Sequence, residues 1–230
     1  MTNGISVKKR NGRGVEPLNL DKIHVMVEEA TKGIAGVSAS QVEIQSGIQF
    51  YDGISTAEIQ EILIKSASDL ISLDNPNYQY VAARLLLFSV RKSLYGGIRD
   101  IPKLVDHIQS CTGNNVYDYG IYDKYSLEEI NRVDSWIDHD RDFLFTYAGL
   151  RQVVDKYLVQ DRSTGKVYET PQFMYMMIAL TIFAEYPKET RLNYVRRYYD
   201  AISRHKINIP TPIMAGVRTP IRQFASCVLV

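Results

Sequence analysis

Apolar residues recur every three or four positions along most of the chain, and this spacing predicts a mainly helical protein. Four helices are predicted in residues 1–95. They begin at Asn19, Ser38, Ser55 and Pro76, which suit an N-cap or a first helical turn. Glycines end the first and the fourth helix. The predicted apolar positions are Ile23, Met26, Val27, Ala30, Val42, Ile44, Ile48, Ile59, Ile62, Leu63, Ala67, Leu70, Tyr80, Ala83, Leu87 and Val90.

The second half of the chain continues the helical pattern. Helices are predicted at about 101–110 and 126–137, and two longer ones at 171–186 and 188–205. The sequence PQFMYMMIALTIFAEY (171–186) is apolar on almost every side, so this helix is predicted to be buried. The last helix is basic on one face.

Short strands complete the pattern and make the predicted fold mainly α with minor β. Residues 5–18 are predicted to form two strands around a glycine-containing turn, and residues 157–168 a hairpin. The segment 207–230 is predicted to be extended, since it is rich in β-branched residues and contains Pro210, Pro212 and Pro220.

Composition narrows the class of protein. A chain of 230 residues holds one large domain or two small ones. The net charge of +1 favours neither nucleic acid nor a membrane surface as a partner, and no apolar run approaches the ~20 residues of a membrane span. The amino terminus lacks a secretory apolar segment, which predicts a cytoplasmic protein. Two cysteines, Cys111 and Cys227, argue against a disulfide scaffold and against a zinc site.

A group of cations in the first 95 residues is the first candidate site. Lys9 and Arg10 lie on a predicted strand, and Lys22 lies on the helix that follows. Lys92 lies near the end of the fourth predicted helix. If these four side chains converge, they can neutralise a triphosphate, and the hydroxyl of Thr56 at a helix start can add a donor. On charge alone, however, the run KKR is more typical of a solvated surface.

The spacing of three motifs favours the functional interpretation. The sequences VKKRNGRGVEPLNLDKI (7–23), YDGIST (51–56) and QYVAAR (79–84) resemble the ATP cone, the regulatory domain at the front of many ribonucleotide reductases. The resemblance covers about 1–95 and implies a short β-sheet with a helical bundle. It also implies ATP or dATP, with Mg²⁺, as an allosteric effector, and base or ribose contacts from Glu16 and Asn19.

One position departs from the cone pattern of the enterobacterial type. The residue four positions after Thr56 is a histidine there and is Gln60 here. Glutamine forms hydrogen bonds but cannot become cationic. The resemblance therefore implies that ATP binding is retained while inhibition by dATP is weak or absent.

The remainder of the chain carries a second set of motifs. The blocks IDHDRD (137–142), YLVQ (157–160), ETRLNYVRRYYDA (189–201) and IPTPIMAGVRTP (209–220), followed by ASCVL, resemble the large subunit of class I ribonucleotide reductases. The resemblance implies a helical domain over 96–206. It further implies that 207–230 is the first strand of an α/β reductase barrel, which another chain completes.

The resemblance also assigns chemistry to the carboxyl-terminal segment. Cys227 matches the first cysteine of the pair that reduces the substrate, and Thr211 and Ser226 match positions that contact the diphosphate and sugar of a ribonucleoside diphosphate. Without the flanking motif, a cysteine among Val, Leu and Phe is typical of a buried apolar thiol. Cys111 has no counterpart in the family, which favours a structural role.

The run Asp138–Asp142 suggests two alternatives. Its carboxylates and imidazole suit a divalent metal. Alternating charges with an internal arginine fit a network of salt bridges and caps at a helix end better, so we predict no metal bound by this chain.

The partners follow from the resemblance. They are a carboxyl-terminal fragment of the large subunit, a small subunit that supplies the radical, and thioredoxin or glutaredoxin. The end of the sequence soon after Cys227 suggests one piece of a split large subunit, which alone would be inactive as a reductase. Two alternatives remain open from the sequence: a nucleotide-sensing module, which the absence of a zinc-ribbon cysteine set disfavours, and an inactive remnant.

Overall fold

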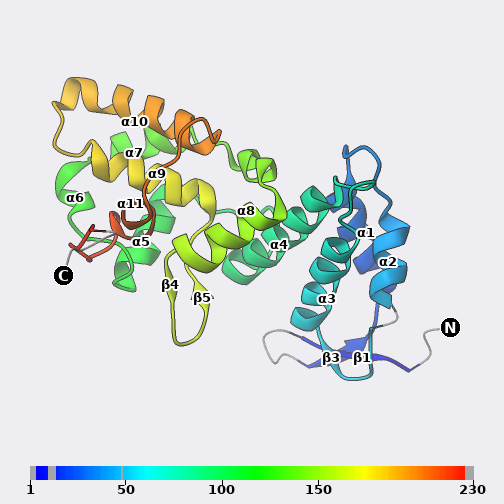
Figure 1. Ribbon diagram of the computed structural model, residues 1–230. Helices are drawn as coiled ribbons and strands as arrows, with labels where there is room; N and C mark the ends of the chain where they lie inside the picture. The colour runs from blue at the N-terminus through cyan, green and yellow to red at the C-terminus, as the bar shows by residue number, and fades with distance from the viewer. Residues whose placement is uncertain (1–3, 10–13, 48, 226–230) are drawn as a thin grey trace, which may run out of the picture. The chain divides into compact units, whose positions relative to one another are not determined.

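The structure is a computed structural model that describes residues 4–9, 14–47 and 49–225 (Figure 1). The chain divides into two compact units. The first consists of Met1–Val90 with Phe145–Arg151, and the second of Arg91–Leu144 with Gln152–Val230. Helices predominate and the described strands are short, so the predicted fold class, mainly α with minor β, is confirmed.

A three-stranded sheet lies at one end of the first unit. Strand β1 (Ser6–Lys8) is central, with β2 (Val15–Pro17) antiparallel on one side and β3 (Ile54–Ser55) parallel on the other. The two strands predicted in 5–18 are therefore confirmed. Val7 and Ile54 pair across the sheet and are both buried. These two side chains are buried in the core of the unit, whose helices lie on one side of the sheet (Figure 1).

The helices of the first unit begin where local capping predicts. Helix α1 (Leu20–Thr31) follows Asn19, whose side chain accepts a hydrogen bond from the backbone of Lys22. Helix α3 (Thr56–Asp69) follows Ser55, which forms a reciprocal capping box with Glu58. Both predicted helices are confirmed. Helices α2 (Ala39–Gly47) and α4 (Tyr78–Tyr95) complete the set.

The predicted apolar faces of these helices are largely correct. All four predicted positions of α1 are buried, as is Val42 of α2. The prediction for Ile44 is wrong, because its side chain is 72% exposed. Helix α2 is polar at most positions and buries only Val42 and Ser46, so it packs through a narrow stripe that excludes Ile44. The predicted position Ile48 lies outside the described residues.

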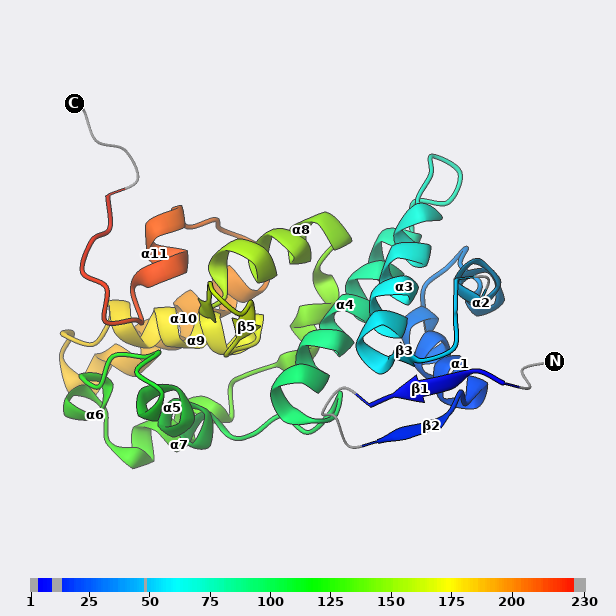
Figure 2. The same cartoon turned by 90° about the horizontal axis from the view of Figure 1, so that it is seen from below.

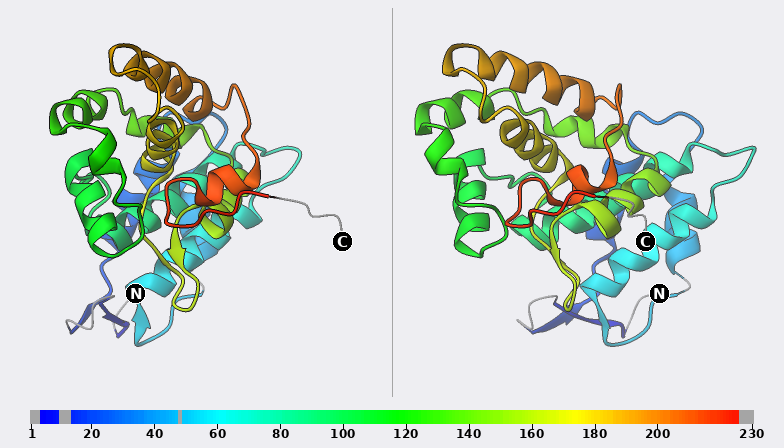
Figure 3. Two further views of the ribbon diagram at one scale, coloured as in Figure 1. Left: turned by 90° about the vertical axis from the view of Figure 1, so that its left-hand side faces the viewer. Right: turned by 60° about the vertical axis from the view of Figure 1, so that its left-hand side comes forward.

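The second unit is built around helix α9 (Pro171–Ile182), in which every residue from Pro171 to Leu180 is buried. The predicted buried helix is confirmed, although it ends four residues early. Figures 2 and 3 show the surrounding elements, and α9 contacts both α10 and α11. The other helices described in this unit are α5 (Leu104–Gly113), α6 (Ile121–Lys124), α7 (Leu127–Asp134), a 3-10 helix (His139–Leu144), a π-helix (Val153–Tyr157), α10 (Lys188–Ser203) and α11 (Thr211–Gly216). Helix α8 (Tyr147–Gln152) belongs to the first unit except for its last residue.

The predicted hairpin is present as strands β4 (Gln160–Asp161) and β5 (Lys166–Val167). Gly165 occupies the left-handed region at φ +70°, which a tight turn requires and which glycine adopts without strain. The hairpin projects from the helices of its unit (Figure 3).

The prediction of an extended segment over 207–230 is wrong for its centre. Thr211–Gly216 form helix α11, and residues 207–225 contain no strand. Pro210 is extended and Pro212 lies in the first turn, where the missing N–H of proline costs nothing. The prolines therefore start a helix here. The rest of the predicted barrel strand, from residue 226 onward, lies outside the described residues.

Among the described residues, none of the helices combines the length and apolar character that crossing a membrane would require.

Candidate functional site

Three residues of the predicted nucleotide site lie together beside the sheet of the first unit. The ammonium nitrogen Nζ of Lys9 lies 2.9 Å from Oε2 of Glu16, and Nζ of Lys22 lies 3.3 Å from Oε1 of the same carboxylate. Lys9, just beyond β1, is still hydrogen-bonded to Gly14 across the hairpin. Glu16 is the partner of Val7 across the ladder, so the alternation of the strands places Lys9, Val7 and Glu16 on the same face.

Solvent reaches this cluster. The side chain of Glu16 is 31% exposed, and those of Lys9 and Lys22 are 45% and 67% exposed. Hydrogen bonds from Lys9 and then Lys22 lower the pKa of the Glu16 carboxyl, so the group is ionised at neutral pH. Exposed ion pairs of this kind are weak and exchange partners readily. The two lysines can therefore bind an anion, and in this structure that anion is the carboxylate of Glu16.

The other predicted nucleotide residues have different surroundings. Asn19 caps α1 through its side-chain oxygen, 3.1 Å from the backbone nitrogen of Lys22, and it lines a pocket of about 460 Å³ with the rest of 16–22. Thr56 is the first residue of α3, directly after the strand residue that pairs with Lys8. Lys92 lies in the last turn of α4, in the part of that helix that belongs to the second unit. Arg10 lies outside the described residues.

Gln60 points into the core of the first unit. Its side chain is 2% exposed, and its amide Nε2 donates a hydrogen bond to the backbone oxygen of Leu85 on α4, at 3.0 Å. This residue therefore links α3 to α4 through a neutral hydrogen bond. A buried amide fills this role without the cost of burying a charge.

The turn before β3 is hydrogen-bonded to the first strand. Asp52 accepts hydrogen bonds from the backbone nitrogen of Ser6 at 2.7 Å and from its hydroxyl at 2.6 Å. Gly53 adopts φ +81°, and a Cβ there would lie 3.9 Å from Nζ of Lys8. The motif YDG was recognised, but a turn with glycine after aspartate also signals this contact to the first strand.

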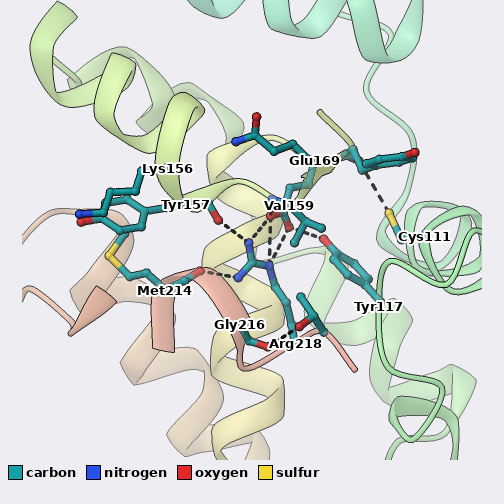
Figure 4. A network of polar contacts seen from close by, with 12 residues as sticks. Cys111, Tyr117, Lys156, Tyr157, Val159, Glu169, Met214, Gly216 and Arg218 are labelled. Atoms are coloured by element: carbon teal, nitrogen blue, oxygen red, sulfur yellow. Dashed lines mark hydrogen bonds and ion pairs between the residues drawn. The ribbon is translucent and has the colours of Figure 1, made fainter. Parts of the chain in front are cut away.

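The second unit contains a fully buried ion pair that sequence reasoning missed (Figure 4). The side chains of Arg218 and Glu169 are both 0% exposed, and Nε of Arg218 lies 2.9 Å from Oε2 of Glu169. The hydroxyl of Tyr117 donates a hydrogen bond to Oε2 of Glu169 at 2.5 Å, and the backbone nitrogen of Val159 donates one to Oε1 at 2.7 Å. The carboxylate is thus fully satisfied inside the protein.

The guanidinium of Arg218 also binds two backbone oxygens. Nη1 donates to the carbonyl of Met214 at 2.5 Å, and Nη2 to the carbonyl of Tyr157 at 3.0 Å (Figure 4). These bonds fix helix α11 against the end of the π-helix. Thr211, at the start of α11, places Oγ1 3.4 Å from the hydroxyl of Tyr157. The other predicted catalytic-segment residues, Ser226 and Cys227, lie outside the described residues.

Cys111 is a buried thiol. It is 2% exposed, and its Sγ lies 3.7 Å from both Nε2 of His107 and the carbonyl of Tyr168. Burial raises the pKa of this thiol to about 12, so it stays protonated and unreactive. These surroundings agree with the predicted structural role.

The predicted salt-bridge network at 138–142 is confirmed. Arg141 pairs with Asp138 at 3.3 Å and with Asp200 at 2.8 Å. Asp142 is buried and pairs with Arg91 at 2.9 Å. In residues 4–9, 14–47 and 49–225, no three His, Cys, Asp or Glu side chains group as a metal site would require.

Comparison with known proteins identifies two domain families. Residues 5–93 match the ATP cone domain, and residues 143–222 match the all-alpha domain of ribonucleotide reductase. Over all 230 residues the chain is 52% identical to the ribonucleoside-diphosphate reductase subunit alpha of Haemophilus influenzae and to the corresponding reductase 1 subunit alpha of Escherichia coli. It is 47% identical over 197 residues (85% of the chain, 26% of the relative) to the subunit alpha of Enterobacteria phage T4. The chain spans 30% of the length of the first two relatives.

Proposed function

The chain belongs to the ribonucleotide reductase large-subunit family, as a homologue of its amino-terminal part, and we propose that it contributes an allosteric nucleotide site and one redox-active cysteine to ribonucleoside-diphosphate reduction. The observation that carries this proposal is the match of the whole chain, at about half identity, to reductase alpha subunits. The cation cluster of the first unit falls inside the region matched to the ATP cone.

The first role is to bind an effector. Lys9, Lys22, Arg10 and Lys92 neutralise the triphosphate of ATP or dATP, which carries Mg²⁺. The hydroxyl of Thr56, the first residue of α3, adds a donor. Glu16 and Asn19 contact the base or ribose of the effector, as the family resemblance implies. The contacts of Lys9 and Lys22 with one anionic group support an anion-binding role for this pair.

The second role is in the reduction itself. Cys227 supplies one of two thiols; as the pair is oxidised to a disulfide, two electrons pass to the substrate and its 2′-hydroxyl leaves as water. Thr211 and Ser226 hold the diphosphate and sugar through their hydroxyls. The hydrogen bonds from Arg218 to the carbonyls of Met214 and Tyr157 hold α11, and with it Thr211, in place.

Other parts of the reaction need groups beyond these 230 residues. Other segments of a large subunit supply the second thiol and the radical cysteine, a small subunit generates the radical, and thioredoxin or glutaredoxin reduces the disulfide after each turnover.

The test uses the chain in its native complex. A tag is placed on the chain in its own cells, the complex is purified, and the conversion of CDP to dCDP is measured with a dithiol reductant. We expect activity that falls below detection in Cys227→Ser, since the two-electron step then lacks a thiol. Cys111→Ser is the matched control and keeps its activity, because the Cys111 thiol is buried and protonated. A complex without CDP reduction, or one in which Cys227→Ser remains active, contradicts the proposal.

A further inference from the structure

The end of the π-helix Val153–Tyr157 is fixed by side chains from two other segments of the second unit. Such helices are rare and often lie at functional sites. The carbonyls of its last four residues each accept a hydrogen bond from a side chain outside it, namely Gln160, Arg162 or Arg218. The last carbonyls of a helix have no partner within the helix, so these donors hold its end in one position.

Tyr157, the last residue of this π-helix, carries its hydroxyl to Thr211 at the start of α11. The two hydroxyl oxygens lie 3.4 Å apart, and Nε2 of Gln152 donates to the Tyr157 hydroxyl at 3.4 Å. Tyr157 and Thr211 are both half-buried, so a ligand can reach the pair. The two distances are long for hydrogen bonds, as is common for contacts that tighten when a substrate binds.

The chemistry of a phosphate fixes the direction of these hydrogen bonds. An ionised phosphate oxygen only accepts, so a bound diphosphate takes the hydroxyl proton of Thr211. The oxygen of Thr211 then remains as an acceptor for the hydroxyl of Tyr157. The amide of Gln152 donates to the Tyr157 oxygen, which favours this orientation of the phenol proton. Hydrogen bonds arranged in such a chain polarise and strengthen one another.

We propose that Tyr157 is a positioning residue, whose hydroxyl donates to Thr211 and so directs the Thr211 proton to the diphosphate of the substrate. This inference rests on the proposed function, in which Thr211 holds that diphosphate. Tyr157 acts through Thr211 and does not itself contact the substrate. Arg218 contributes by holding the carbonyl of the same tyrosine at 3.0 Å (Figure 4).

The alternative is a purely structural role for the ring of Tyr157. Nζ of Lys156 lies 5.5 Å from the centre of this ring, a cation–π contact that needs no hydroxyl. Phenylalanine keeps the ring and this contact and removes only the hydroxyl. Tyr157→Phe therefore separates the two roles, since only the positioning role needs the phenol oxygen.

The experiment measures the rate of CDP reduction by the purified native complex against CDP concentration, with a dithiol reductant in excess. We expect Tyr157→Phe to raise the KM for CDP about three- to tenfold, the effect of one hydrogen bond on an affinity, with little change in kcat. The matched control is Tyr119→Phe, which removes the hydroxyl of an exposed tyrosine in the same unit and should leave the KM unchanged. The urea midpoint of Tyr157→Phe, followed by the fluorescence of Trp136, should equal that of the unmodified chain.

Thr211→Val tests whether Tyr157 acts through Thr211, because valine keeps the shape of threonine and lacks the hydroxyl. We expect Thr211→Val to raise the KM for CDP, and Tyr157→Phe to add no further increase in the double variant, since the phenol has then lost its partner. Effects that multiply in the double variant would show that Tyr157 acts independently of Thr211, and would overturn the inference.

Two further outcomes also overturn the positioning role. One is an unchanged KM in Tyr157→Phe where Thr211→Val raises it, and the other is a rise in KM that accompanies a lowered urea midpoint. An unchanged KM in Thr211→Val instead removes the substrate contact of the proposed function, and the inference with it. A native complex that reduces no CDP removes the proposed function as a whole.

Discussion

Each unit of this molecule contains a carboxylate held by cations, and the two clusters differ in burial. Glu16 in the first unit has a side chain that is 31% exposed, between lysines that are more exposed still. The side chain of Glu169 in the second unit is 0% exposed, as is that of its partner Arg218. The chemistry is similar, but water screens the first cluster and is excluded from the second. Burial therefore decides whether an ion pair can be exchanged for a ligand or must remain intact.

The buried pair remains intact because every group in it is satisfied. Removing two charges from water costs several kcal/mol for each ion, which good geometry and additional hydrogen bonds must offset. Tyr117 and Val159 donate to the carboxylate, and two carbonyls accept from the guanidinium. No ligand could replace Glu169 without breaking this set. We therefore assign the buried pair to the anchoring of α11, and the proposed binding role concerns the exposed cluster alone.

The largest predicted effect is the loss of one buried partner. Arg218→Met should destabilise the second unit by about 3–5 kcal/mol, because it leaves the Glu169 carboxylate buried without its cation. The chain has a single tryptophan, Trp136, which lies in the second unit, so tryptophan fluorescence in urea follows the unfolding of that unit.

An exposed pair on the same segment provides the control. Arg222 pairs with Asp118, with side chains that are 65% and 34% exposed. Arg222→Met should lower the free energy of unfolding by less than about 1 kcal/mol in the same assay. The double variant Arg218→Met/Glu169→Leu should recover most of the loss, because it removes both buried charges. Equal effects of Arg218→Met and Arg222→Met would show that burial does not separate the two kinds of pair.

A second prediction concerns acid pH. His107 is buried against Phe173 and lies 2.9 Å from the hydroxyl of Tyr117, and burial lowers its pKa to about 4. The folded state holds this imidazole neutral, whereas the unfolded chain protonates it below about pH 6.5. Its contribution to stability is therefore present above pH 6.5 and is lost as the pH falls towards 4, by up to about 3 kcal/mol.

The measurement is the free energy of unfolding of the second unit between pH 7 and 4, again by tryptophan fluorescence. In His107→Gln the fall in stability with acid should be smaller than in the unmodified chain. Asp142 acts in the opposite direction, since burial raises its pKa to about 6, and it offsets part of the slope in both proteins. An identical slope in both would contradict the assignment to His107.

The exposed histidine of the first unit sharpens the contrast. His24 lies 2.8 Å from Glu43 and 3.2 Å from Glu28, and the hydrogen bond with Glu43 is the main cause of its raised pKa. Its contribution to stability is present at low pH and is lost as the pH rises above its pKa. The contributions of the two histidines to stability therefore change with pH in opposite directions. His107 is buried in the core, whereas His24 lies beside two carboxylates.

The sequence predicted the elements that depend on local chemistry. The caps at Asn19 and Ser55 and the apolar run of α9 each lie within a few consecutive residues, so their helices were correctly placed. The buried pair was missed because Glu169 and Arg218 are 49 positions apart. Charged residues in a sequence are usually at the surface, and only the packing of α11 reveals this exception.

In the candidate site, too, only the features that depend on local structure were predictable. Lys9, Glu16 and Lys22 lie within one short hairpin and the first turn of α1, so their proximity follows from local structure. That Glu16 contacts both lysines is not visible in the sequence, from which the family resemblance implies only a contact with the base or ribose. Helix α11 was missed because a proline-rich segment fits both an extended strand and a helix start.

A smaller effect is expected at Gln60, the buried amide of the first unit. Gln60→Leu removes the donor to the Leu85 carbonyl and should destabilise this unit by about 1 kcal/mol, the net value of one buried hydrogen bond. Hydrogen exchange of the amides of α3 gives the measurement. Gln60→Glu is the paired variant; it should cost more, because it buries a charge in place of a neutral donor.

The same residue carries a regulatory prediction. A neutral amide cannot take the place of the histidine of enterobacterial-type cones, so the native complex should bind ATP but be inhibited only weakly by dATP. The measurement is CDP reduction by the purified complex against dATP concentration. Strong inhibition by micromolar dATP would show that a glutamine at position 60 does not prevent inhibition by dATP.

The smallest predicted effect on folding is at Glu16. Its ion pairs are exposed, so Glu16→Gln should leave the thermal midpoint of the chain within about 1 °C of the unmodified value. The exchange rates of the α1 amides, measured by mass spectrometry, should also be unchanged, since Asn19 and not Glu16 caps that helix. A clear loss of protection in α1 would mean that the carboxylate holds the hairpin to the helix, as Glu169 holds its own surroundings. A variant that alters ATP affinity without altering either readout would place Glu16 in ligand binding and outside the fold, and this is the distinction that burial draws between the two clusters.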